Sequence, residues 1–382
     1  MVVTATKYAK STSETGKVLT IITSQQLSQS GGKDLSQVLQ AQAGIVVNGA
    51  TSNPGKDKSL FLRGAGGEYT LILLDGVPVT DPSGFGGVFD LRLLPIDDIQ
   101  RIEILKGSQS TLYGSNAVAG VINIITKKGG DKPFGVSGLL SGGSYQTGKA
   151  QLGVNGHINK VDYTAAYTYL TTKGISEARE NIASDDFDKD GLTQQAFNIN
   201  TGIQASDKLL IRPFIRYSQF EGKYDAGAYT DDKEATYTAN LLNSGVSAEY
   251  ELSKGAINFQ YAFDQTNRKY TNAFGETEFK GLFHHGELFA NYRINKYLEV
   301  LTGINLQQLR MPDTTTTIKN PEVQMISPFA SLFIQPIQGF SLELGGRYNH
   351  HSRYGSNYTY SINPSYIINN NIKLFVNYST GF

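Results

Sequence analysis

The sequence contains no cysteine and no tryptophan among its 382 residues, and only 18% of its residues are charged. The absence of cysteine excludes disulfide frameworks, thiolate metal sites and cysteine nucleophiles. Lysine plus arginine equals aspartate plus glutamate, at 34 each, so the charge gives no reason to expect a nucleic-acid partner. No apolar run approaches the roughly 18 residues that a membrane-spanning helix needs. If the chain crosses a membrane, it must do so as a closed β-barrel.

Catalytic motifs are missing as well. The sequence has neither the G-x-S-x-G turn of serine hydrolases nor the H-E-x-x-H motif of zinc proteases. Its histidines lack a matching pattern of serine and aspartate. We therefore expect this chain not to be an enzyme.

The first 128 residues or so have the pattern of a compact domain with mixed α and β structure. Leu35, Val38 and Leu39 recur at the spacing of one helical face, directly after a polar segment. This spacing predicts a short helix with one buried side. Apolar runs predict buried strands at 70–74, 102–105 and 121–125.

From about residue 134 the pattern changes to one long strand after another, with apolar and polar residues alternating. Near the end of the chain, four residues fall on one face at every second position: Ile372, Leu374, Val376 and Tyr378. The predicted strands are about 10 to 15 residues long, against a usual length of about 5 to 6. Tight turns alternate with long polar loops at 174–191 and 223–234. This pattern favours a transmembrane antiparallel β-barrel; the alternative is a soluble β-sandwich or barrel.

The number of these alternating runs is odd. Counting them gives about 13 strands, the last of which begins near Ile372. Bacterial single-chain barrels have even strand numbers. We therefore expect the sequence to be truncated at its C-terminal end.

Residues 101–128, RIEILKGSQSTLYGSNAVAGVINIITKK, resemble the end of the plug domain of TonB-dependent outer-membrane receptors. Two shorter segments, LFLRG at 60–64 and LLDGVP at 73–78, are similar to plug strand signatures and occur in the family's order. One position departs, since Ser108 stands where the family usually has proline. The resemblance implies a mainly β fold, with a mixed α/β plug domain at 9–130 inside a transmembrane antiparallel β-barrel at 131–382. The complete family fold would have about 22 barrel strands, of which about 13 are expected here.

The N-terminal segment, residues 1–8, contains a short β-prone stretch that looks like the TonB box of the same family: Val2, Val3, Thr4 and Ala5. By itself it would be an ordinary β-prone terminus. A strand at an exposed terminus can add to the edge of a partner's sheet, so that a pulling force passes through backbone hydrogen bonds. The resemblance implies that these four residues bind TonB.

Acidic residues gather in two of the long loops. Asp186, Asp188 and Asp190 match the start of a D-x-D-x-D-G calcium loop, but the twelfth position is Phe197 instead of a bidentate glutamate. The next loop would supply the missing ligands: Tyr224, Asp225, Asp231 and Asp232. The loops are similar to the calcium-binding loops of the cobalamin (vitamin B12) receptors in this family, a similarity that also implies Glu177. We therefore expect bound calcium; the alternative is that these loops are merely solvated.

The ligand is expected at the outer end of the plug. By the same resemblance, two plug loops would contact it, with these residues: Lys56, Asp57, Lys58, Ser83, Phe85, Gly86 and Val88. Cobalamin or another corrinoid is the first choice. The charged Lys-Asp-Lys run favours an anionic ferric siderophore as the alternative, and the pairs His284-His285 and His350-His351 raise haem as a third. Alternation along a strand sends adjacent histidines to opposite faces.

These features together predict a TonB-dependent active transporter for a scarce nutrient, in the outer membrane of a Gram-negative bacterium. A passive porin would need neither a plug nor a TonB box. The expected partners are TonB, the small-molecule ligand and outer-membrane lipid; a surface lipoprotein is left open as a further one. Energy would come from the inner-membrane proton gradient through TonB, so that no nucleotide or redox cofactor is needed.

Overall fold

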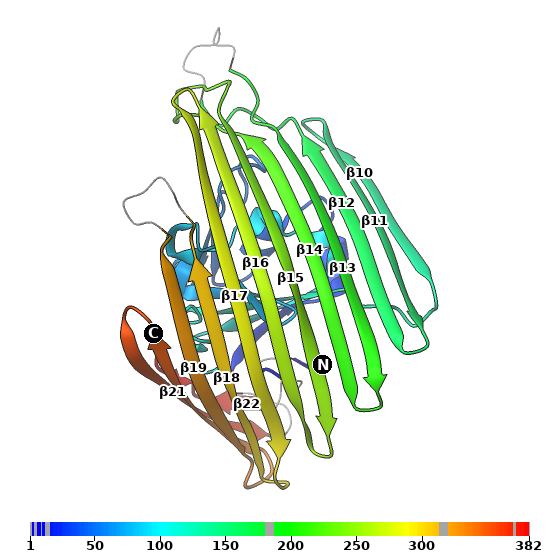
Figure 1. The fold of residues 1–382 in the computed structure, drawn as a ribbon, viewed down its shortest axis with the longest axis vertical. Helices are drawn as coiled ribbons and strands as arrows, with labels where there is room; N and C mark the ends of the chain where they lie inside the picture. The colour runs from blue at the N-terminus through cyan, green and yellow to red at the C-terminus, as the bar shows by residue number, and fades with distance from the viewer. Residues whose placement is uncertain are drawn as a thin grey trace.

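The computed structural model describes residues 2–3, 6–8, 10–11, 16–179, 187–312, 320–369 and 372–381. It is mainly β, as predicted. Long tilted strands form a curved wall, and the N-terminal elements, blue and cyan in Figure 1, lie behind it on the concave side. Among the described residues, no helix has the length and apolar character needed to cross a membrane.

The N-terminal domain is built on a five-stranded mixed sheet with the order β3-β8-β9-β6-β7. Its strands are β3 (Val18–Ile22), β8 (Ile99–Lys106), β9 (Gly120–Thr126), β6 (Thr70–Leu74) and β7 (Val77–Val79). Around the sheet lie the hairpin β4 (Ile45–Asn48) and β5 (Ser59–Leu62), the helices α1 (Ser24–Gln29), α2 (Leu35–Gln40) and α3 (Ser110–Tyr113), and the 3-10 turns η2 (Gly67–Tyr69), η3 (Phe85–Gly87), η4 (Leu91–Leu93) and η5 (Ile96–Asp98). The three predicted apolar strands are present, and β6 and β9 are buried along their whole length.

The predicted helix is α2. Asp34 caps it, because its carboxylate accepts a hydrogen bond from the Gln37 backbone N–H at 2.8 Å, and the Gln37 side chain accepts one from the Asp34 N–H at 3.1 Å. This capping box satisfies backbone groups that the first helical turn leaves free. Leu35, Val38 and Leu39 are buried, as their spacing predicts.

The C-terminal part is one antiparallel sheet in which each strand pairs with the next along the chain. Its strands are β10 (Gly135–Gly143), β11 (Thr147–Ile158), β12 (Val161–Thr172), β13 (Leu192–Ser206), β14 (Leu209–Lys223), β15 (Thr236–Leu252), β16 (Gly255–Asn272), β17 (Gly275–Arg293), β18 (Leu298–Arg310), β19 (Glu322–Ile334), β20 (Phe340–His351), β21 (Gly355–Ile368) and β22 (Ile372–Phe375). β23 (Tyr378–Ser379) also pairs with β21, so that the last predicted strand is interrupted after Phe375. Within the described residues β10 and β22 do not pair with each other, and the sheet is an open arc.

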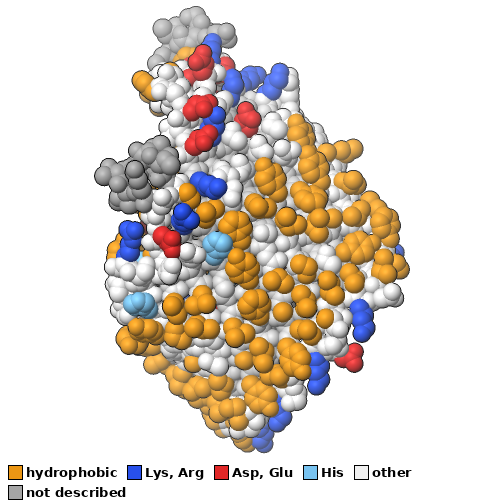
Figure 2. All heavy atoms as spheres, in the orientation of Figure 1, with side chains coloured by type: hydrophobic (Ala, Val, Ile, Leu, Met, Phe, Trp, Pro, Cys, Tyr) orange, Lys and Arg blue, Asp and Glu red, His pale blue; other side chains and the backbone are white. Residues whose placement is uncertain are grey.

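The two faces of this sheet differ in chemistry. The outer face carries a broad area of hydrophobic side chains, while charged side chains gather mainly toward the two ends of the strands (Figure 2). The inner face is largely polar; Asn243 and Asp264, for example, are 1% exposed. An apolar outer face and a polar interior are the pattern of a barrel in lipid.

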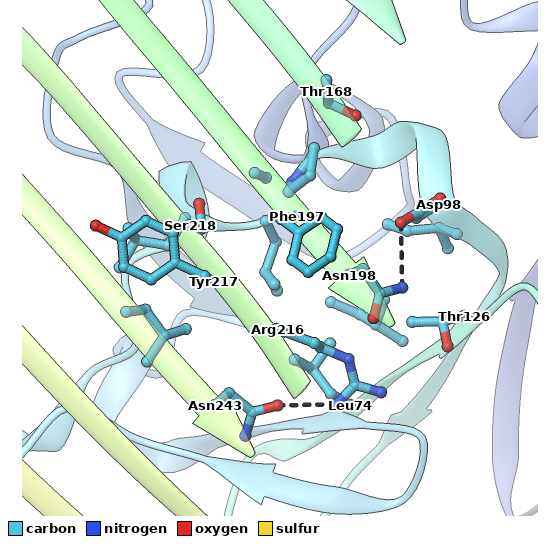
Figure 3. A pocket seen from close by; sticks show the side chains of 17 residues that line it. Leu74, Asp98, Thr126, Thr168, Phe197, Asn198, Arg216, Tyr217, Ser218 and Asn243 are labelled. Carbon is cyan, nitrogen blue, oxygen red and sulfur yellow. Dashed lines mark hydrogen bonds between the residues drawn. The ribbon is translucent and has the colours of Figure 1, made fainter. Parts of the chain in front are cut away.

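The plug packs directly against the polar inner wall. Figure 3 shows one part of this contact, where Asn198 on β13 donates a hydrogen bond to the Asp98 carboxylate at 3.1 Å, and Arg216 on β14 donates one to Asn243 at 2.8 Å. The gap there has a volume of about 50 Å³. Arg216 also forms an ion pair with Asp75, in the turn after β6. This gap has room for a few water molecules and is too small to hold a nutrient.

Candidate ligand and cation sites at the outer end of the plug

Two plug loops, 49–58 and 80–90, lie at the end of the barrel where the long loops are found. The second loop turns sharply at Gly86 and Gly87, whose φ angles are +65° and +69°, a conformation that costs glycine little. Asp81 holds the start of this loop, because its carboxylate accepts hydrogen bonds from the Ser83 N–H and hydroxyl at 2.9 and 2.5 Å. Phe85 is left 94% exposed at the tip.

A cavity of about 510 Å³ opens between these loops and the barrel wall. This volume lies within the range of about 300 to 1,000 Å³ that is usual for small-molecule sites. Four of the seven predicted ligand residues line it: Asp57, Lys58, Phe85 and Val88. The other three do not: Lys56 pairs with Glu177, Ser83 binds Asp81, and Gly86 forms the turn. Sequence reasoning missed the other lining residues, which include four charged ones: Glu68, Asp90, Arg92 and Arg268.

Charges of both signs line this cavity, and Arg92 pairs with two of the carboxylates. Arg92 contacts the Asp90 carboxylate at 2.7 Å and the Asp57 carboxylate at 2.5 Å, and its guanidinium lies over the Phe220 ring at 4.5 Å. Burial favours the protonated form of Asp90, but the charge and the hydrogen bonds of Arg92, with the charge of Arg268, together outweigh burial and hold the pKa of Asp90 below its ordinary value. Three cationic and three acidic side chains line the cavity: Lys58, Arg92, Arg268, Asp57, Glu68 and Asp90. Their formal charges cancel.

The ammonium of Lys58 is bound within its own loop. Its ammonium donates hydrogen bonds to the carbonyl oxygens of Gly49 and Asn53, at 2.5 and 3.2 Å. The residue is only 8% exposed, and this burial lowers the pKa of the ammonium. Lys58 therefore holds the 49–58 loop together, and the ligand contact that its sequence position predicts stays a prediction.

Three carboxylates from the two acidic loops converge beside the plug. Asp188, Asp190 and Asp225 each offer an oxygen atom within 4.8 Å of the others. Asp190 is fully buried, and one oxygen of Asp190 and one of Asp188 have no hydrogen-bond partner among the described residues. The loops are interlocked here, since the Asp225 carboxylate accepts a hydrogen bond from the Ala178 N–H at 2.6 Å.

The other predicted metal ligands take different positions. The Glu177 carboxylate pairs with Lys56 at 2.8 Å, and the Tyr224 hydroxyl donates to the Thr271 carbonyl at 3.5 Å. Asp231 accepts a hydrogen bond from the Asp188 N–H at 3.2 Å, while the Asp232 carboxylate accepts from the backbone N–H groups of Glu234 and Ala235, at 3.2 and 3.1 Å. Asp186 lies outside the described residues.

Holding these three carboxylates close together costs free energy unless a cation or a proton neutralises part of their charge. Burial raises the pKa of Asp190 to about 7, and the nearby negative charge of Asp225 acts in the same direction, although a hydrogen bond from the Glu177 N–H opposes both. Lys223 supplies a positive charge at the edge of the cluster, where it pairs with Asp188 at 2.6 Å. Converging oxygen ligands with unused lone pairs fit a hard cation such as calcium.

Three lysines near the N-terminus form buried ion pairs with the inner wall. Lys7 contacts both carboxylate oxygens of Glu287, at 2.8 and 2.9 Å. The other two pairs, each at 3.0 Å, are Lys10 with Glu299 and Lys17 with Glu343. Within the predicted TonB box, β1 (Val2–Val3) pairs with β2 (Lys10–Ser11), and Thr4 and Ala5 lie outside the described residues.

The histidine pairs are split between the faces of the sheet, as alternation predicts. His285 is 1% exposed on the inner side, whereas His284 makes a hydrogen bond of 2.9 Å with Tyr261 on the outer face. This arrangement gives no pair of histidines facing one ligand.

Comparison with known families accounts for nearly the whole chain. Residues 11–121 match the TonB-dependent Receptor Plug Domain, and residues 130–382 match the TonB dependent receptor-like beta-barrel. The chain therefore belongs to the TonB-dependent receptors, a family of receptors and transporters in the outer membrane.

Among individual relatives, the vitamin B12 transporter BtuB of Photobacterium profundum is 25% identical, over all of this chain and 62% of its own length. The ferric enterobactin receptor of Pseudomonas aeruginosa is 24% identical, over 89% of this chain and 55% of its own. Its PfeA crystal structure, a mutant form, gives a TM-score of 0.79 at 19% identity, with 94% of this chain and 61% of that chain covered. This chain thus spans a little over half of each of these relatives.

Proposed function

We propose that this receptor imports a corrinoid such as cobalamin across the outer membrane, with calcium in its outer loops and with energy supplied by TonB. Family membership supports the class of function. The substrate rests on one observation above all, the balance of charge around the cavity at the outer end of the plug. Two of the three cations there have carboxylate partners, Arg92 with Asp57 and Asp90, and Arg268 with Asp81. The formal charges that line the cavity cancel, so that a strongly anionic ligand would find no surplus of positive charge.

Calcium would be held by Asp188, Asp190 and Asp225; the convergence of the three carboxylates and the unpartnered oxygens of Asp188 and Asp190 support this assignment. It would neutralise the repulsion within the cluster and fix the two acidic loops against each other. The ligand would then be enclosed between these loops and the plug. TonB would bind the N-terminal strand and pull it, and that force would have to break the buried ion pair of Lys7 before the plug is remodelled.

Phe85 offers the sharpest test of the cavity as the ligand site. Its ring is almost fully exposed, so replacement by alanine should not disturb the fold. Burying a phenylalanine side chain against a ligand contributes about 1.5 to 3 kcal/mol, which corresponds to a loss of affinity of about tenfold to a hundredfold in Phe85→Ala. The matched control is Phe274→Ala, because Phe274 is 99% exposed and does not line the cavity.

The assay is a calorimetric titration of the complete receptor with cyanocobalamin, with and without calcium. Absence of binding in both conditions would exclude the corrinoid. Binding that Phe85→Ala and Phe274→Ala reduce equally would place the ligand elsewhere.

A ferric siderophore is the second candidate. The presence of three cations at the cavity favours it, as does the likeness to a relative named for ferric enterobactin. A siderophore ligand would have to displace the carboxylates of Asp57 and Asp90 from Arg92. Titration with a ferric catecholate under the same conditions separates the two candidates.

A further inference from the structure

The plug loop that borders the cavity also contacts the barrel loop that carries the acidic cluster. The link is Asn53, which is 3% exposed. Its side-chain amide donates hydrogen bonds to the carbonyl oxygens of Ile175, at 3.1 Å, and Asp190. Sequence reasoning gave Asn53 no role, because the contact joins residues more than 100 positions apart.

These two carbonyl groups mark the base of the acidic loop. The Asp190 N–H donates to the Ile175 carbonyl at 3.1 Å, which closes the loop on itself. The carboxylate of the same Asp190 accepts a hydrogen bond from the Glu177 N–H at 2.6 Å and faces the other two aspartates. Asn53 therefore binds the backbone of a residue whose side chain belongs to the cluster.

The packing around Asn53 leaves it little freedom. Gly174 lies against it with a φ angle of +63°, and a Cβ atom at that position would collide with the Asn53 amide oxygen and with the Asp190 carbonyl. Lys56, three residues further along the plug loop, pairs with Glu177 of the same barrel loop at 2.8 Å. The contact thus has a buried part at Asn53 and a half-exposed part at Lys56.

The other end of this plug loop faces the cavity. Lys58 binds the carbonyl of Asn53 itself, and Arg92 binds the carbonyl of Gly55 at 2.5 Å and the carboxylate of Asp57. One end of the segment 53–58 therefore contacts the acidic cluster. The other end, Asp57 and Lys58, lines the cavity.

We propose that Asn53 is a positioning residue that couples cation binding in the barrel loop to the shape of the ligand cavity. A cation at Asp188, Asp190 and Asp225 fixes the backbone at Asp190. Through its hydrogen bond to that backbone, Asn53 then restricts the motion of plug residues 53–58. The cavity wall therefore already has the conformation that binds the ligand. This inference rests on the proposed calcium site. Coupling is reciprocal, so ligand and calcium raise each other's affinity by the same factor, which is typically about 5- to 150-fold in such systems.

The first experiment reports on the plug loop without any ligand. These 382 residues contain no cysteine, so among them Thr51→Cys adds one site for a spin label, on an exposed part of the loop; any cysteine elsewhere in the complete receptor is replaced by serine. We expect calcium to immobilise this label in the complete receptor, with the same midpoint as calcium binding measured by calorimetry. In Asn53→Ala, saturating calcium should leave the label mobile, whereas the control Asn48→Ala, at an exposed position of the same plug segment, should respond as the parent does.

The possible outcomes distinguish a failure of the coupling through Asn53 from a failure of the proposed calcium site. Calcium binding without a change in the label, or an equal response in Asn53→Ala and the parent, would overturn the coupling and leave the calcium site standing. Failure to bind calcium at all would overturn both. If Asn53→Ala does not fold, Lys56→Met removes the half-exposed part of the contact and should reduce the response of the label to calcium. A response equal to that of the parent would again overturn the coupling.

A second readout separates positioning from a merely structural effect. The affinity for cyanocobalamin is measured with and without calcium, and the ratio is the coupling factor. We expect Asn53→Ala to bring this ratio close to one while changing the calcium-free affinity less than threefold. An unchanged ratio would contradict the inference.

Discussion

The buried ion pair between Lys7 and Glu287 gives a prediction about how the N-terminal segment is held. Both side chains are nearly inaccessible, at 6% and 2% exposure, and the ammonium also lies 4.4 Å from the centre of the Tyr113 ring. Glu287→Gln leaves the shape of the site almost unchanged and removes the negative charge. Breaking a buried pair by removing one partner costs about 3 to 5 kcal/mol.

Because Lys7 lies in a short segment, we expect the loss to appear as local release of residues 6–11 and not as global unfolding. About 3 to 5 kcal/mol corresponds to a rise of roughly two to three and a half powers of ten in the opening equilibrium, up to the point at which the segment is fully released. Hydrogen exchange of the backbone amides in this segment, followed by mass spectrometry, measures that change.

Glu276→Gln is the matched control. Its partner is Lys269 at 2.7 Å, but the two side chains are 56% and 40% exposed, and exposed pairs typically contribute only about 0.2 to 1 kcal/mol. The control should leave exchange in residues 6–11 unchanged. If Glu287→Gln also leaves it unchanged, the ion pair does not hold the segment.

The pH dependence of the Glu287→Gln variant follows from Lys7. Burial lowers the pKa of the Lys7 ammonium, and Glu287 partly counteracts this, so the variant should lower it further. A base with a lowered pKa in the docked state binds fewer protons there than when released, and docking therefore strengthens as the pH rises toward the ordinary lysine pKa of about 10.4. The difference in docking between the variant and the parent should therefore shrink as the pH rises toward that value; a difference that does not change with pH would contradict this assignment.

Three further predictions concern the outer end. Asp190→Asn should weaken calcium binding by at least about tenfold in calorimetry, since one of few carboxylate ligands is lost, whereas Asp207→Asn, in the tight turn after β13, should have no effect. Because burial raises the pKa of Asp190 to about 7, calcium must displace a proton at lower pH, and its affinity should fall by up to about tenfold per pH unit below 7 and level off above 8; a flat profile from pH 5 to pH 8 would be contrary to this. Arg92→Leu leaves Asp90 buried and unpaired, so the free energy of unfolding should fall by about 3 to 5 kcal/mol. The control is Lys33→Leu, at an exposed position. If both variants shift the thermal unfolding temperature equally, Arg92 does not stabilise the plug by pairing with Asp90.

Local sequence patterns were sufficient to predict most of the secondary structure of this fold. The helical spacing of Leu35, Val38 and Leu39 and the alternation that begins at Ile372 both depend on neighbours within a few residues, and both elements are present. The thirteen consecutive strands β10 to β22 agree with the expected count for the same reason. The alternation of apolar and polar residues did not indicate that the last strand is interrupted after Phe375.

The sites were predicted less completely, because they depend on contacts between distant segments. Asp188 and Asp190 in one loop do lie close to Asp225 in the next, while the cation that their pattern predicts stays a prediction. That pattern could not indicate that Glu177 pairs with Lys56 on the plug. Asn53 and Arg92 gave no signal at all, since their roles come from partners on other elements.

Uptake of radiolabelled cyanocobalamin by cells that express this receptor as their only candidate importer tests the central proposal most directly. Matched cells with and without TonB are compared at limiting ligand concentration. We expect accumulation in the presence of TonB and only surface-bound ligand in its absence. Equal accumulation in the two strains would contradict energy coupling through TonB, and no binding or accumulation in either would contradict the corrinoid.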